Sequence, residues 1–128
     1  MMKRLLLLLL LLPLSLFAQF TDDFSDGDFT HDPAWTGTEE QYKVNDKHQL
    51  QLNAEEAGYA WLSLPITEFE TMEWRFWVKE AFAPSSNNYT DVWLCADNAN
   101  LTQAIQGYFL RFGEAGGDDA VTLFRKDA

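Results

Sequence analysis

The sequence predicts an all-β protein, an antiparallel β-sandwich of the jelly-roll type. No long stretch has helical periodicity, and aromatic residues, which favour half-buried strand positions, make up 15% of the chain. Short runs instead alternate apolar and polar side chains with the period of two that a strand imposes. Glycine, proline, asparagine and aspartate separate these runs at the spacing of strands and turns in a sandwich.

The clearest alternating run spans residues 72–79. A strand there would place Met72, Trp74, Phe76 and Val78 on one face, and three charged side chains with a tryptophan on the other. A slip of one residue would bury those charges, so the register of this strand is well specified.

Further strands are predicted on either side of this run. In the strand at 91–96 we expect Val92, Leu94 and Ala96 to point inward. Loops are expected where turn-forming residues gather, as in the Pro-Ser-Ser-Asn-Asn stretch and before the last strand. The predicted strands are 49–53, 59–64, 91–96, 108–112 and 121–125, and the predicted loops are 84–88 and 113–119.

The first eighteen residues have the layout of a secretory signal peptide. Lys3 and Arg4 form a basic start, eight leucines follow at 5–12, and Ala18 offers a small residue for cleavage. The apolar run is shorter than the ~20 residues that a membrane-spanning helix needs. We therefore expect a signal peptide at 1–18, a single β-sandwich domain at 19–128, and a secreted or cell-surface protein with no membrane insertion after cleavage.

Charge and cysteine content restrict the partners further. The formal net charge is −11, and removal of Lys3 and Arg4 leaves seven basic residues against twenty acidic ones, a net charge of −13. This charge repels phosphate backbones and anionic membranes, so we expect no nucleic-acid partner. Cys95 is the only cysteine among these 128 residues, so they hold no internal disulfide and must be stabilised by their core. The alternative is a partner cysteine in sequence beyond them.

Two segments carry a resemblance to a known family. Residues 22–29 (Asp-Asp-Phe-Ser-Asp-Gly-Asp-Phe) with residues 33–37 (Pro-Ala-Trp-Thr-Gly) resemble the start of concanavalin A-like, or laminin G-like, jelly-roll domains. Residues 107–114 and 121–125 are similar to adjoining strands of such domains. The resemblance implies the front of a bacterial secreted or surface protein. Because members of the family usually continue well past this length, we expect a domain truncated at its C-terminus, with further domains in the full-length chain.

Hydrolytic chemistry finds little support in these residues. Glycoside hydrolases need two carboxylates across the scissile bond, and the nearest cluster is Glu68, Glu70 and Glu73. Glu70 and Glu73 would fall on opposite faces of a strand, and His31 and His48 lack a serine or cysteine partner. No catalytic residue is therefore predicted. One alternative is the N-terminal part of a jelly-roll glycoside hydrolase with its carboxylates beyond Ala128; another is a structural spacer.

The leading hypothesis is a non-catalytic binding or adhesion module with a glycan as ligand. Sugars present apolar C–H faces that stack on aromatic rings, while nearby carboxylates and guanidinium groups bond their hydroxyls. Side chains of both kinds lie on the strand faces opposite the apolar stripe, and Trp77 is the best candidate because charged residues share its side. The predicted carbohydrate-binding residues are Tyr59, Trp61, Arg75, Trp77, Asp91, Trp93 and Arg111.

A calcium ion is the one cofactor that the sequence suggests. Ser25-Asp26-Gly27-Asp28 resembles a calcium loop in miniature, although the helical calcium loop fails because Phe24 would occupy its third position. Jelly-roll modules often hold a structural calcium, so the resemblance makes Asp26 and Asp28 candidate ligands. Residues 117–119 are a weaker candidate of the same kind.

Overall fold

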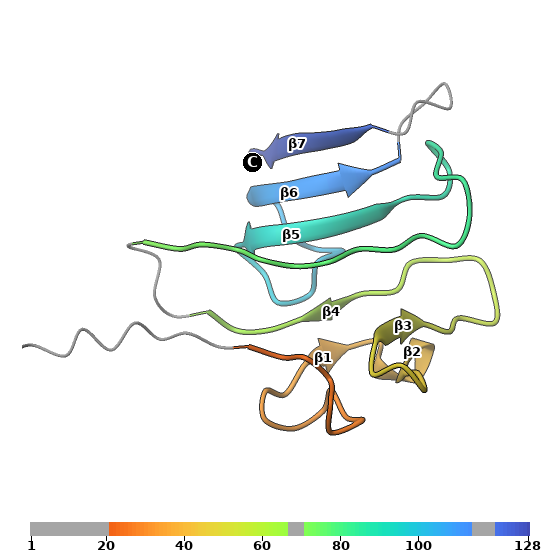
Figure 1. Cartoon of the computed structure of the whole chain (residues 1–128). Helices are drawn as coiled ribbons and strands as arrows, with labels where there is room; N and C mark the ends of the chain where they lie inside the picture. The colour runs from red at the N-terminus through yellow and green to blue at the C-terminus, as the bar shows by residue number, and fades with distance from the viewer. Residues whose placement is uncertain (1–20, 67–70, 114–119) are drawn as a thin grey trace, which may run out of the picture.

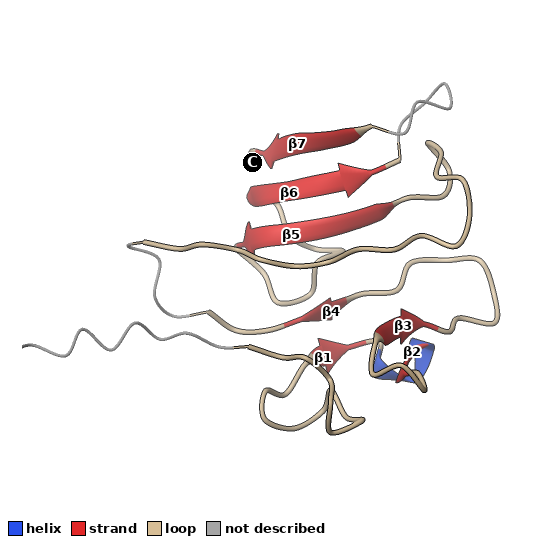
Figure 2. Cartoon of the chain, viewed as in Figure 1, coloured by secondary structure: helices blue, strands red, loops and turns tan. Residues whose placement is uncertain are grey.

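The computed structural model describes residues 21–66, 71–113 and 120–128. Within them the only helical element is the 3-10 turn η1 (Glu39–Gln41), so the prediction of an all-β fold is confirmed (Figure 2). The strands are β1 (Thr36–Gly37), β2 (Tyr42–Val44), β3 (Leu50–Leu52), β4 (Leu62–Ser63), β5 (Thr90–Ala96), β6 (Gly107–Phe112) and β7 (Val121–Lys126).

The strands pair in three antiparallel sheets. The largest has the order β5-β6-β7, and two smaller sheets are formed by β1 with β4 and by β2 with β3. In the view of Figure 1, the three-stranded sheet lies above β4 and β1, and β2 and β3 lie at the lower right. The longest strands therefore gather in the C-terminal third of the chain.

Several predicted strands are confirmed with shifts of at most one residue at each end. The runs at 49–53, 91–96, 108–112 and 121–125 correspond to β3, β5, β6 and β7. The run at 59–64 is reduced to the two residues of β4, and β1 and β2 were not predicted. Strands of two or three residues are too short to show an alternation, and this explains why β1 and β2 carry no sequence signal.

The prediction of a strand at residues 72–79 is wrong. These residues run as an extended segment, drawn in green between β5 and β4 in the view of Figure 1, and belong to no sheet. Trp74 and Val78 are half-buried, whereas Met72 and Phe76 are 38% and 45% exposed. Alternation sorts side chains onto two faces, but a strand also needs a neighbour whose amides and carbonyls meet its own. The apolar stripe is thus only partly covered.

The two faces of the β5-β6-β7 sheet differ in burial. The more buried face is that of Phe109, whereas the sequence predicted that the face of Val92 points inward. Phe109 is 8% exposed, whereas Tyr108, Val121 and Leu123 on the opposite face are 43%, 56% and 61% exposed. Val92 pairs with Leu110 and Leu110 with Leu123, so Val92 of our inward set lies on the more exposed face, whereas Ala96 pairs with Gly107 beyond the register shift of β5 and lies on the face of Phe109. The correction has a physical reason, because large rings bury more apolar area than valine or alanine.

Several sequence predictions lie outside the described residues. They are the signal peptide at 1–18, Glu68 and Glu70, and most of the loop at 113–119 with its candidate calcium residues. Over the ranges that are described, no helix has the length and apolarity required to traverse a bilayer. Cys95 is half-buried and carries a free thiol.

Candidate functional site

Three of the predicted carbohydrate-binding residues come together on the β5-β6-β7 sheet. Asp91 and Arg111 are direct cross-strand partners, and the Arg111 Nε and Nη2 atoms each donate to a carboxylate oxygen of Asp91 at 2.7 Å. The two side chains are only 26% and 19% exposed, for Arg111 and Asp91 respectively. A bidentate pair with this little exposure is geometrically fixed and stronger than a surface ion pair.

Aromatic rings surround this ion pair. The Trp93 and Phe109 ring centroids are 4.6 Å apart, and Phe109 stacks on Phe124 at 5.2 Å with an interplanar angle of 11°. The Arg111 guanidinium lies 3.9 Å from the centroid of the Tyr89 ring, within the range of a cation–π contact. The sequence thus grouped Trp93, Asp91 and Arg111 correctly, and their groups mainly contact one another and the adjacent rings.

Two other predicted residues flank β4. The Trp61 backbone N–H donates to Thr38 Oγ1 at 2.9 Å, and its carbonyl accepts from the Thr38 N–H at 2.9 Å. Gly37 leaves room for this approach, since a Cβ there would lie 2.1 Å from the Trp61 carbonyl oxygen. Trp61 is half-buried by this packing, whereas Tyr59 is 80% exposed. Only the tyrosine presents most of its ring to solvent.

The remaining predicted residues lie in the extended segment at 71–83. Trp77 is 67% exposed. Arg75 Nε donates to Glu73 Oε1 at 2.5 Å, and both side chains are largely exposed. This segment therefore presents an open indole ring, an exposed acceptor and an exposed donor within five residues of chain.

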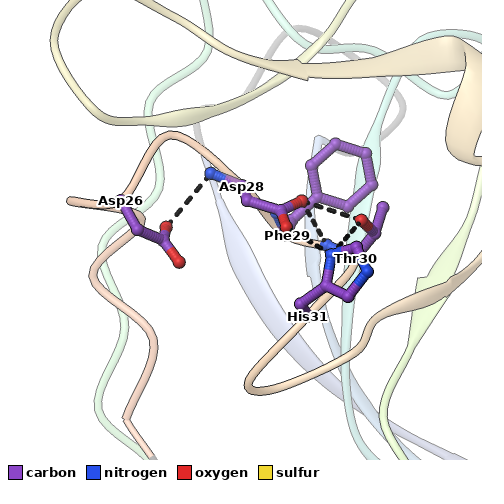
Figure 3. A network of polar contacts seen from close by, with 5 residues as sticks. All are labelled: Asp26, Asp28, Phe29, Thr30 and His31. Carbon is purple, nitrogen blue, oxygen red and sulfur yellow. Dashed lines mark hydrogen bonds and ion pairs between the residues drawn. The ribbon is translucent and has the colours of Figure 1, made fainter.

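The candidate calcium residues form an aspartate-rich turn (Figure 3). Asp28 Oδ1 accepts from the N–H groups of Phe29 and Thr30 and from the Thr30 hydroxyl, at 2.7 to 2.8 Å. Its Oδ2 lies 2.6 Å from His31 Nδ1, and Asp26 Oδ1 accepts from the Asp28 N–H at 3.0 Å. The Thr30 N–H, followed by His31, holds the pKa of Asp28 well below its usual value, and Asp28 raises the pKa of His31.

This turn does not fit a metal ion in its present form. A calcium ion takes six to eight oxygen ligands, whereas Asp28 Oδ1 already accepts three hydrogen bonds and Oδ2 lies against His31 Nδ1. Gly27 explains the turn without a metal, because its φ of 81° lies in the left-handed region and its N–H donates to the Phe24 carbonyl. Within residues 21–66, 71–113 and 120–128, no three metal-ligating side chains are grouped for an ion.

Among the described residues, one buried carboxylate oxygen accepts no hydrogen bond. Glu80 Oε1, at the end of the extended segment, is shielded from solvent and accepts no hydrogen bond from the described residues. Leaving a buried acceptor unpaired costs about 1–3 kcal/mol. By the alternation of residues 72–79, Glu80 falls on the predicted apolar face, next after Val78, and we did not single it out from the sequence.

The sequence also missed some partners of the residues that it singled out. His31 was considered only for a serine or cysteine partner, and its contact with Asp28, three residues before it in the turn, was not predicted. Tyr89 lies between the predicted loop at 84–88 and the predicted strand at 91–96 and was not assigned to the site, yet its ring faces Arg111. The Asp-x-x-His spacing could have signalled the first pair; nothing in the sequence signals the second.

No protein-family model matches this chain, and no curated protein or solved structure matches it either. We infer function from the chain's own residues.

Proposed function

We propose that this protein is a non-catalytic binding module that recognises carbohydrate, and that its sheets belong to a jelly-roll sandwich of the concanavalin A-like kind. The observation that carries the proposal is the exposure of Trp77, whose ring is 67% exposed in an otherwise extended segment. Exposing a large indole ring to water has a free-energy cost, which a bound ligand would reduce by covering the ring. The apolar C–H face of a sugar is a surface on which such a ring can stack.

The groups beside Trp77 support the same ligand. Sugar hydroxyls both donate and accept, and the exposed pair of Glu73 and Arg75 supplies an acceptor and a donor together. The pair is electrically neutral as a unit, and the chain as a whole carries a net charge of −11. Long-range repulsion then disfavours polyanionic ligands, so neutral glycans are the expected class.

The test is affinity electrophoresis of the protein through gels that contain soluble neutral polysaccharides: a β-glucan, a xylan and a mannan. We expect at least one of them to retard the wild-type protein and Trp77→Ala to reduce the retardation. Trp77→Phe, which keeps a ring, should retain most of it. Phe82→Ala serves as a matched control because Phe82 is 42% exposed in the same segment and has no charged pair beside it. Equal migration of wild type with and without every polysaccharide contradicts the proposal.

We also propose that the protein is exported, with residues 1–18 removed as a signal peptide. The basic start, the leucine run and Ala18 support this proposal. Expression of the whole chain in a bacterial host, followed by intact-mass measurement of the secreted or periplasmic product, should give a mass that begins at Gln19. A product that keeps Met1 and stays in the cytoplasm contradicts it.

A further inference from the structure

One end of the β5-β6-β7 sheet is hollowed, and none of the predicted site residues lies there. The hollow has a volume of about 330 Å³ and opens to solvent where β5 ends, β6 begins and β7 ends. This volume is near the lower end of the range of about 300–1,000 Å³ that small-molecule sites occupy. Its lining carries six polar or aromatic side chains: Asp97, Gln106, Tyr108, Arg125, Lys126 and Asp127.

The floor of the hollow is rigid. Gly107 lies between Ala96 and Lys126 in the ladder, and a Cβ at Gly107 would come within 2.3 Å of the Cys95 carbonyl oxygen. The pairing register of β5 shifts between Trp93 and Cys95, which is a bulge of the kind found beside binding sites. Backbone that is packed this closely holds the side chains around it in place.

Asp97 and Gln106, the two ends of the loop at 97–106, line the hollow and are held together by hydrogen bonds. Asp97 Oδ1 accepts from the N–H groups of Ile105 and Gln106 at 3.0 and 3.1 Å, and the Asp97 N–H donates to the Gln106 carbonyl. Lys126 Nζ donates to the carbonyl of Ala104, which is 1% exposed. Both bonds to Asp97 use Oδ1, and Oδ2 accepts no hydrogen bond from the described residues.

The side chains at the mouth combine a ring with donors and acceptors. Tyr108 pairs directly with Cys95 on one side and Arg125 on the other, and it is 43% exposed. Arg125 Nε donates to Asp127 Oδ1 at 2.7 Å, and both of these side chains are 64% exposed. An exposed phenol ring can stack on a sugar ring, and the exposed donor and acceptor beside it can hydrogen-bond the sugar hydroxyls.

The charge of the lining determines whether the hollow favours neutral or anionic sugars. Two acidic and two basic side chains line the hollow, so its formal charge is zero within a chain of net charge −11. An anionic sugar would meet no excess of positive charge locally and repulsion from the rest of the molecule. We propose that this hollow is a subsite for one residue of a neutral glycan, with Tyr108 stacking on the ring and Asp97, Arg125 and Asp127 bonding its hydroxyls. This inference rests on the proposed function and adds a site that is separate in sequence from Trp77.

Isothermal titration calorimetry of the full chain with neutral tetrasaccharides of glucose, xylose and mannose, and with a tetragalacturonate, tests the inference. We expect binding of a neutral tetrasaccharide and none of the tetragalacturonate. Tyr108→Ala should weaken binding about tenfold, as loss of a contact worth roughly 1.4 kcal/mol would. Tyr108→Phe should stay within about twofold of wild type, because the ring is kept. Leu123→Ala, which removes an exposed side chain on the same face outside the hollow, is the matched control.

The outcomes separate the two proposals. If a neutral tetrasaccharide binds and Trp77→Ala weakens it while Tyr108→Ala and Asp127→Ala do not, the subsite is overturned and the proposed function stands. If Tyr108→Ala weakens binding and its circular dichroism and melting temperature match those of Leu123→Ala, the subsite is supported. If only tetragalacturonate binds, the charge argument and the neutral subsite both fail. If wild type binds none of the four, both proposals fail.

Discussion

The three-stranded sheet and the extended segment at 71–83 have the same period-two alternation but different structures. In β5, β6 and β7 every residue lies in or beside an antiparallel ladder, and the ring of Phe109 stacks on Phe124 and contacts the tilted ring of Trp93 across it. In the segment at 71–83, the described residues make no backbone–backbone hydrogen bond, and large side chains such as Phe76 and Trp77 are exposed. The difference shows that alternation determines which side chains share a face, whereas covering that face requires a partner.

The comparison assigns different roles to the two regions. Rings and a half-buried ion pair make the sheet the stable part of the molecule, because burial and a paired backbone both favour it. The segment keeps its rings accessible, and that accessibility is what a ligand needs. Under the proposed function, the sheet would supply a rigid support and the exposed groups beside it would supply recognition.

Amide hydrogen exchange should show the largest difference between the two regions. Amides in the interior of β6, such as those of Phe109 and Leu110, should be protected on the order of a thousandfold or more in a domain of ordinary stability. Amides of residues 72–79 should exchange within about tenfold of the unprotected rate, since no ladder holds them. Equal protection of the two sets, measured by mass spectrometry of peptic peptides, would mean that the segment is a paired strand.

Removing one ring from each region should affect stability unequally. Phe109 is 8% exposed and contacts two other rings, so Phe109→Ala should lower the free energy of unfolding by about 3–5 kcal/mol. Phe76 is 45% exposed, so Phe76→Ala should cost less than about 1 kcal/mol. Urea titrations followed by tryptophan fluorescence measure both values. If Phe76→Ala lowers the free energy of unfolding as much as Phe109→Ala does, the segment is packed as tightly as the sheet and the contrast between the two regions is wrong.

Two of the Arg–carboxylate pairs, Asp91–Arg111 and Glu73–Arg75, provide the same contrast with charges. Asp91→Ala leaves the half-buried Arg111 without its bidentate partner and should cost about 1–3 kcal/mol. Glu73→Ala removes the exposed partner of Arg75 and should change stability by less than about 0.5 kcal/mol. Urea titrations measure both changes in the free energy of unfolding. Asp91→Asn, which removes the charge and keeps the size of the side chain, shows how much of the lost stability is due to the charge. A negligible effect of Asp91→Ala would mean that the ion pair contributes little net stability.

Neutralising Glu80 should stabilise the protein, whereas the substitutions above destabilise it. Its Oε1 atom is shielded and unpaired among the described residues, so Glu80→Gln, which removes the charge and keeps the shape, should raise the free energy of unfolding by about 1 kcal/mol. Glu55→Gln is the matched control, because Glu55 is exposed and should give no change. Destabilisation by Glu80→Gln would mean that this carboxylate has a partner that stabilises it.

The sequence predicted features that depend on residues close together in the chain, and it failed where a feature depends on packing between distant segments. Alternation located β3, β5, β6 and β7 because it is a local pattern that every long strand must show. It also placed Asp91, Trp93 and Arg111 on one face. It could not tell which face would be covered, since that depends on what packs against the sheet. For the same reason it failed at residues 72–79, where the pattern is strong and no ladder forms.

The candidate site was predictable to a similar degree. Trp77 and Tyr59 were named from their strand faces, and both are highly exposed. Tyr108 was assigned to the apolar stripe, because a phenol ring beside Leu110 and Phe112 is indistinguishable in sequence from a core residue. Its place at the mouth of a hollow depends on the turn at 97–106 and on the end of β7, which are distant in sequence. Sites that join distant segments carry no local signal.

The smallest effect should come from the aspartate-rich turn, which lies outside both regions. Because Asp28 accepts from His31 Nδ1, the pKa of His31 is raised above its usual 6.5, with smaller contributions from the charges of Asp32 and Asp26. A raised folded-state pKa stabilises fully below the unfolded value and is lost as pH rises through the folded value. The melting temperature should therefore fall slightly more between pH 6 and pH 8 in wild type than in His31→Gln. His48→Gln should behave like wild type. If the two profiles of wild type and His31→Gln coincide, the Asp28–His31 contact in Figure 3 contributes nothing to folding in solution, and the turn is held by the backbone bonds to Asp28 alone.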